Sequence, residues 1–79
     1  INFMSLEHQI HHVFNNFENI SSNEIIKILT QIKPKFKNQI ISDYLQGKIQ
    51  KILELNEEFE KKKQCKALIP YLDWYMQGI

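Results

Sequence analysis

The stretch ISSNEIIKILTQIKP, residues 20–34, decides the fold because it carries two signals for the start of a helix. Ser21 stands three residues before Glu24, which is the spacing of a capping box. Ile20 and Ile25 flank this pair at the spacing of a hydrophobic staple. The two signals agree on one boundary and predict a turn that ends at the first serine, followed by a helix.

The remainder of this stretch indicates a helix that is apolar on nearly every side. Its aliphatic positions are Ile25, Ile26, Ile28, Leu29 and Ile32. We expect it to run from Ser22 to Lys33, because Pro34 pushes the residue before it out of the helical region. A helix with so little polar surface is a buried one. Either the C-terminal segment folds back over it or another chain covers it.

Helical spacing continues on both sides of the central stretch. Before it, Ser5 is available as the N-cap of a helix with an apolar stripe. That stripe consists of Leu6, Ile10, Val13, Phe14, Phe17 and Ile20. After it, Pro34 can be the first residue of a third helix. We expect this third helix to pass through Gly47 without a break, because a glycine inside a helix costs only about 1 kcal/mol.

The apolar stripe of the third helix thins beyond Leu55. The segment from Glu54 to Lys66 has the pattern of a solvated continuation of that helix, with glutamates four residues before lysines. Those pairs are Glu57 with Lys61 and Glu58 with Lys62. Pro70 then marks a kink or a new helix start. The last apolar stripe, in a short aromatic helix, consists of Leu68, Leu72, Tyr75 and Met76.

Composition supports the same fold class. The chain has 79 residues, 43% of them hydrophobic and 24% charged, with a net charge of +1. Two glycines and two prolines are too few for the turns of an all-β fold of this length. No apolar run approaches a membrane span, and no export signal is apparent. We therefore expect one all-α domain over residues 1–79, a bundle of three to five helices, either a small subunit or a piece of a larger protein.

The lone cysteine and the histidines carry no strong chemical signal. Cys65 has no partner for an internal disulfide, which favours a reducing compartment, the cytoplasm or the nucleus. Its alternative role is a reactive thiolate, stabilised by neighbouring lysines. His8 and His12 lie four apart, but a zinc site needs at least three protein ligands, and both histidines point away from the apolar stripe. We expect surface histidines, no metal and no cofactor.

The sequence holds no recognisable catalytic motif. No serine stands in a nucleophile-elbow context, and two isolated glycines cannot form a phosphate-binding loop. We therefore expect a non-catalytic interaction module that docks a helix of another protein, or a second copy of itself, in an apolar groove. The groove would be lined by Ile25, Ile28, Ile32, Phe36 and Tyr44. Trp74 lies off the last stripe, so it is either an exposed anchor for the partner or a core residue.

The alternative function is binding of a polyanion. Four lysines precede the aromatic C-terminal segment, namely Lys61, Lys62, Lys63 and Lys66. Together with Trp74 they would bind single-stranded nucleic acid or an anionic membrane surface. Glutamates at 57, 58 and 60 weaken this patch, and the chain contains no arginine, the residue best suited to reading base edges. Any nucleic-acid binding would therefore be non-specific in sequence.

Overall fold

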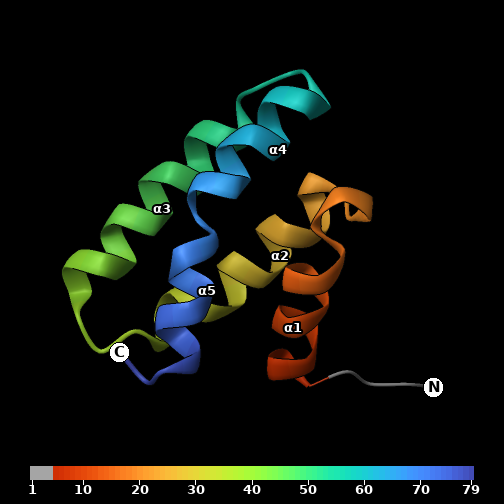
Figure 1. Cartoon of the computed structure of the whole chain (residues 1–79). Helices are drawn as coiled ribbons and strands as arrows, with labels where there is room; N and C mark the ends of the chain where they lie inside the picture. The colour runs from red at the N-terminus through yellow and green to blue at the C-terminus, as the bar shows by residue number, and fades with distance from the viewer. Residues whose placement is uncertain (1–4) are drawn as a thin grey trace.

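The computed structural model describes residues 5–79, which form five α-helices and no strand (Figure 1). The α-helices are α1 (Leu6–Asn16), α2 (Ser22–Ile32), α3 (Gln39–Leu53), α4 (Glu58–Ala67) and α5 (Ile69–Met76). Two short 3₁₀-helices, η1 (Phe17–Asn19) and η2 (Lys33–Lys35), flank α2. The predicted all-α bundle of three to five helices is confirmed. None of the described helices is long and apolar enough to cross a membrane.

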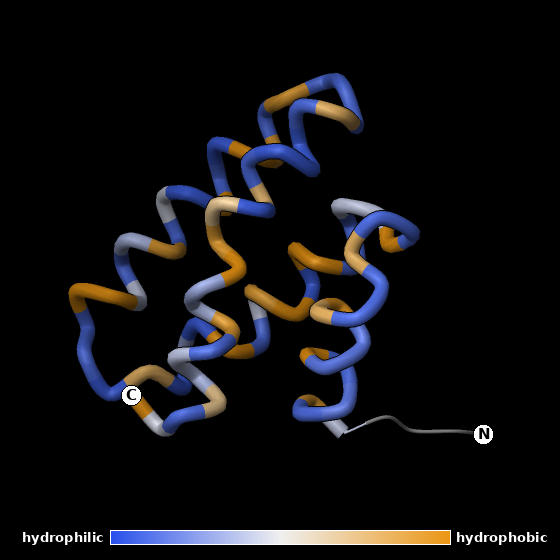
Figure 2. The backbone as a smooth tube through the Cα atoms, in the orientation of Figure 1, coloured by the Kyte–Doolittle hydropathy of each residue, from blue (hydrophilic) through white to orange (hydrophobic). Residues whose placement is uncertain are grey.

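Helix α2 lies at the centre of the bundle and contacts each of the other four α-helices. Its hydrophobic positions lie in the middle of the molecule (Figure 2), and all five of its aliphatic side chains are buried. Burying a side chain of this size contributes about 2 kcal/mol. The α2 helix therefore contributes more buried hydrophobic side chains than any other helix. The covering comes from this chain itself, with α5 folding back onto α2.

The predicted start of α2 at Ser22 is confirmed by a capping contact, and its end lies one residue before the predicted Lys33. The backbone N–H of Glu24 donates to Oγ of Ser21 at 3.3 Å, and Ile20 and Ile25 are both buried in one core. The helix ends at Ile32, immediately before the 3₁₀-helix that contains Pro34. At the other predicted start, Ser5 caps α1 in the same way.

Helix α4 binds the junction between α1 and α2 through two charged side chains. The carboxylate of Glu58 accepts hydrogen bonds from the backbone N–H of Ser22 at 2.8 Å and from its hydroxyl at 2.7 Å. The ammonium group of Lys62 donates to the backbone carbonyls of Phe17 and Ile20. The negative group thus meets the N-terminus of α2, and the positive group meets the C-terminal end of the α1–η1 segment. Each charge is favoured there by the helix dipole.

The predicted third helix differs from the observed α3 at both ends. Helix α3 begins at Gln39, where the side chain of Asn38 accepts from the backbone N–H of Ile40 at 2.8 Å. Pro34 lies instead in η2. The passage of α3 through Gly47 is confirmed. A proline can occupy the first position of a helix, but here the helix begins further along the chain, where Asn38 provides a side-chain cap.

The prediction that the third helix continues from Glu54 to Lys66 is wrong at residues 54–57, where the helix is interrupted, although residues 58–66 are helical. Helix α3 ends at Leu53, and the turn that follows lets α4 pack beside α3 and α2. This reversal buries Cys65 and Leu68, which a straight continuation would carry away from the core. Glu58 and Lys62 are also not simply a solvated pair, because each bonds the α1–α2 junction. The core contacts that α4 makes after the turn stabilise the fold more than an unbroken helix would.

The two glycines of the chain should respond oppositely to alanine. A side chain at Gly47 would meet nothing within 4 Å, so Gly47→Ala should stabilise the protein by about 0.5–1 kcal/mol. Gly78 has φ +83°, where a Cβ atom is strained, so Gly78→Ala should destabilise by about 1 kcal/mol. Urea unfolding followed by circular dichroism measures both. A loss of stability in Gly47→Ala would contradict the open surroundings of this position.

The contact between Glu58 and Ser22 should make stability depend on pH. The hydrogen bonds from the backbone and side chain of Ser22, and then the nearby lysine charges, hold the pKa of Glu58 below its usual value. A carboxyl with a lowered pKa stabilises the fold above its unfolded-state pKa and loses that contribution as the pH falls through its folded-state pKa. Glu58→Gln should therefore be less stable than the wild type near neutral pH, and the difference should shrink in acid.

Urea midpoints measured from about pH 7 to about pH 2.5 test this expectation. The matched control is Glu57→Gln, because Glu57 is exposed and makes no capping hydrogen bond. A difference between wild type and Glu58→Gln that stays constant across this range would contradict the assigned contact.

Candidate protein-binding surfaces

The groove expected from the sequence is not open in the structure. Ile25, Ile28, Ile32 and Phe36 are all buried in the core, so the chain's own helices occupy the space intended for a partner. This corrects the expectation that these residues line a docking groove. The physical reason is that the other four helices, including the returning α4 and α5, cover the aliphatic side chains of α2. Tyr44, the fifth predicted groove residue, is 48% exposed.

The structure brings Tyr44 and Trp74 together on one exposed surface. We define the aromatic surface as Ile40 and Tyr44 of α3 with Tyr71 and Trp74 of α5. The Tyr44 and Tyr71 rings stack with centroids 5.8 Å apart, and Trp74 meets Tyr71 edge to face at 4.9 Å. Trp74 is 39% exposed, so it is a surface residue held by the neighbouring ring.

The rings of the aromatic surface are fixed from below and from the side. Buried Phe36 meets Tyr71 edge to face at 6.5 Å, which ties the surface to the core. The ammonium group of Lys48 lies 5.8 Å from the centre of the Tyr44 ring. Burial and the neighbouring Tyr44 raise the pKa of Tyr71, so its hydroxyl stays neutral at physiological pH. The surface is therefore uncharged at its centre, with a cation at its edge.

Ile40 was not among the predicted binding residues, although it is 77% exposed. The missed signal was Asn38, because a cap there places Ile40 in the first turn of α3 rather than well inside a helix. A residue at the beginning of a helix can point past the end of the neighbouring helix and remain uncovered.

The four lysines of the predicted anion site do not act as one patch. Lys62 is engaged by backbone carbonyls and by the Phe17 ring, whose centroid lies 4.5 Å from its ammonium group. Lys61 is half-buried and lies close enough to Glu58 to help lower its pKa. Lys63 and Lys66 are exposed. Each lysine–phosphate contact releases about one counterion, and this release drives polyanion binding. Two exposed lysines therefore provide little affinity for a polyanion.

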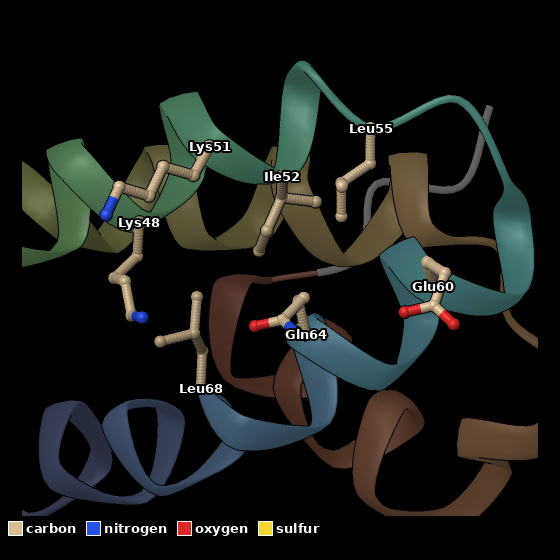
Figure 3. Close-up of a pocket in the computed structure, with 7 residues that line it drawn as sticks. All are labelled: Lys48, Lys51, Ile52, Leu55, Glu60, Gln64 and Leu68. Carbon is tan, nitrogen blue, oxygen red and sulfur yellow. The ribbon is translucent and has the colours of Figure 1, made fainter.

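A cleft of about 250 Å³ lies between α3 and α4. Figure 3 shows Ile52 and Leu55 reaching into it from the α3 side, with Gln64 and Leu68 facing them from the α4 side. Two lysines and Glu60 complete the lining. The described residues that line this cleft include no histidine, cysteine or hydroxyl group.

The histidines lie where the sequence placed them. His8 and His12 are both exposed on α1. Among residues 5–79, no group of three or more histidine, cysteine, aspartate or glutamate side chains could hold a metal ion. The expectation of no metal and no catalysis stays a prediction.

Comparison with protein families, characterised proteins and solved structures found no match for this chain. The assignment of a function therefore rests on the surfaces described above.

Cys65 should be unreactive in the folded protein. Its side chain is fully buried, and burial together with the charge of Glu58 raises the pKa of its thiol to about 11 from 9.0. The thiolate population near pH 8 is then lower by about a hundredfold, and a reagent must also wait for the fold to open. Labelling with a disulfide reagent in buffer and in urea measures this protection. Equal rates in both would revive the reactive-thiolate hypothesis.

Proposed function

We propose that this chain is a non-catalytic protein-interaction module that binds another protein through the aromatic surface. The observation that supports it is the half-exposed Trp74, held in place by Tyr71 beside exposed Tyr44 and Ile40. Tryptophan and tyrosine are the residues that most often dominate binding energy at protein interfaces. The buried thiol of Cys65 suits a reducing compartment, so we place this function inside the cell, in the cytoplasm or nucleus.

Rigidity of the aromatic surface is a second argument for binding. A side chain that is already ordered loses little conformational entropy when a partner covers it. Tyr71 is in ring contact with Phe36, Tyr44 and Trp74, so the surface is ordered before any partner arrives. Tyrosine and tryptophan also carry a hydroxyl and an N–H group that can bond a partner's backbone. An adaptor or a small subunit of an assembly needs a surface of this kind.

Site-specific photocrosslinking tests the proposal. A benzoylphenylalanine placed at Ile40 should form a crosslink to a partner in source-cell extract, because that side chain is 77% exposed at the edge of the surface. The same group at exposed Gln50 of α3 is the control. We expect at least about a fivefold higher yield at position 40, and a reduction of that yield by Trp74→Ala.

The identity and behaviour of the adduct decide the proposal. Equal yields at positions 40 and 50, or a yield that Trp74→Ala does not change, would contradict it. An adduct of twice the chain's mass would identify the partner as a second copy. With a purified partner, the emission of Trp74 gives an independent measurement, because it is the only tryptophan and should shift to the blue when covered.

A further inference from the structure

A second apolar surface lies between the α1–η1 segment and the α4–α5 segment. Two hollows of about 420 and 340 Å³ adjoin there, sharing Phe17, Glu18 and Lys66 among the residues that line them. We call this surface the phenylalanine groove and define it by six of its lining residues: Phe14, Phe17, Phe59, Lys63, Lys66 and Ile69. None of these residues belongs to the aromatic surface.

The phenylalanine groove contains aromatic side chains that are exposed and therefore add little to the stability of the fold. Phe59 is 76% exposed and Phe14 is 37% exposed, while Phe17 is half-buried between them. These are three of the five phenylalanines in the chain. Single exposed hydrophobic residues are ordinary, but aromatic side chains gathered around two adjoining hollows are typical of a binding site.

The charges of α4 are sorted by helix face. Phe59, Lys62, Lys63 and Lys66 have the spacing i, i+3, i+4, i+7 and line the groove side together. The acidic residues of the same helix turn elsewhere, since Glu58 bonds Ser22 and Glu60 lines the α3–α4 cleft. Glu18 is the one carboxylate among the residues that line the two hollows. The groove is therefore basic, although the whole chain is close to neutral.

We propose that the phenylalanine groove binds an amphipathic helix of another protein, one that carries acidic residues beside its apolar stripe. The apolar stripe would pack on Phe14, Phe17 and Phe59, as helices do in hydrophobic grooves. The acidic residues would face Lys63 and Lys66, which are both exposed. Complementary charge fixes the orientation of such a helix and raises its association rate.

The shape of this surface favours a helix over the other anionic partners. A membrane contacts a flat or protruding face, whereas these residues line a hollow between helices. A single-stranded nucleic acid needs a track of cations, and here Lys62 is engaged by backbone carbonyls while two lysines are exposed. The apolar lining, which includes Ile69 and Pro70, also offers aliphatic contacts that suit a leucine-bearing helix better than a phosphate backbone.

A display library tests the proposal without knowledge of the natural partner. The library contains helices of about 18 residues with a fixed leucine stripe and with flanking positions that vary among Glu, Gln and Lys. Selection on the intact chain should enrich glutamate at the flanking positions. Enrichment of lysine, or no enrichment of either charge, would overturn the proposal.

Variants then assign the selected helix to the groove. Phe59→Ala should weaken its binding at least about fivefold while leaving the fold intact, because Phe59 is largely exposed. Lys63→Glu with Lys66→Glu should weaken it more than Lys35→Glu with Lys37→Glu, which makes the same change of net charge at exposed lysines elsewhere. Equal effects of the two double variants, or no effect of Phe59→Ala, would overturn the assignment to this groove.

Two further probes separate the competing partners. Vesicles of phosphatidylcholine with phosphatidylserine and a single-stranded oligothymidine are titrated at low and moderate salt. We expect both to bind more weakly than the selected helix, with Trp74→Ala leaving the helix affinity unchanged. Tighter, steeply salt-dependent binding of either probe would overturn the proposal of a helical partner and indicate a membrane or a nucleic acid instead. Loss of helix binding in Trp74→Ala would instead move it to the aromatic surface.

Discussion

The burial of α2 is the constraint on which the rest of the structure depends. A small domain has little core, and here the central helix α2 buries five aliphatic side chains, while its polar residues form one exposed face. The expectation of a helix that is apolar on nearly every side is corrected by this face, which consists of Asn23, Glu24, Lys27, Thr30 and Gln31. Four other helices are needed to cover it, and each contributes an inner face to the same core. The faces left over, on α3 with α5 and on α1 with α4, are the two surfaces for which we propose partners. The proposed binding surfaces are thus what remains after the central helix has been covered.

Helix α4 shows how a mostly hydrophilic helix can join such a core (Figure 2). Its inner stripe, Glu58, Lys62 and Cys65, has the spacing i, i+4, i+7, and two of those three residues are charged. They are tolerated because each charge finds the complementary end of a helix segment at the α1–α2 junction. The neighbouring stripe, which contains Phe59 and Lys63, is therefore turned outward. One pair of polar contacts sets the position of the phenylalanine groove.

The sequence predicted most accurately where the signals are local. The start of α2 follows from Ser21 and Glu24, and the passage of α3 through Gly47 follows from unbroken helical phase. The turn between α3 and α4 was missed because its cause is tertiary: Cys65 and Leu68 reach the core only if the chain reverses. Asn56 was the weak local hint, since asparagine favours turns.

The same distinction explains the candidate site. Ile25 and Ile32 were correctly identified as apolar positions in need of cover, but spacing along one helix cannot say which segment supplies that cover. The sequence predicts that nearby glutamates weaken the lysines beyond residue 60. The two kinds of residue are close along the sequence, but they lie on different faces of α4. Because Glu58 and Glu60 turn away from the groove, a chain of nearly zero net charge presents a locally basic hollow. Net charge constrains long-range attraction, whereas docking responds to the few charges that line the contact.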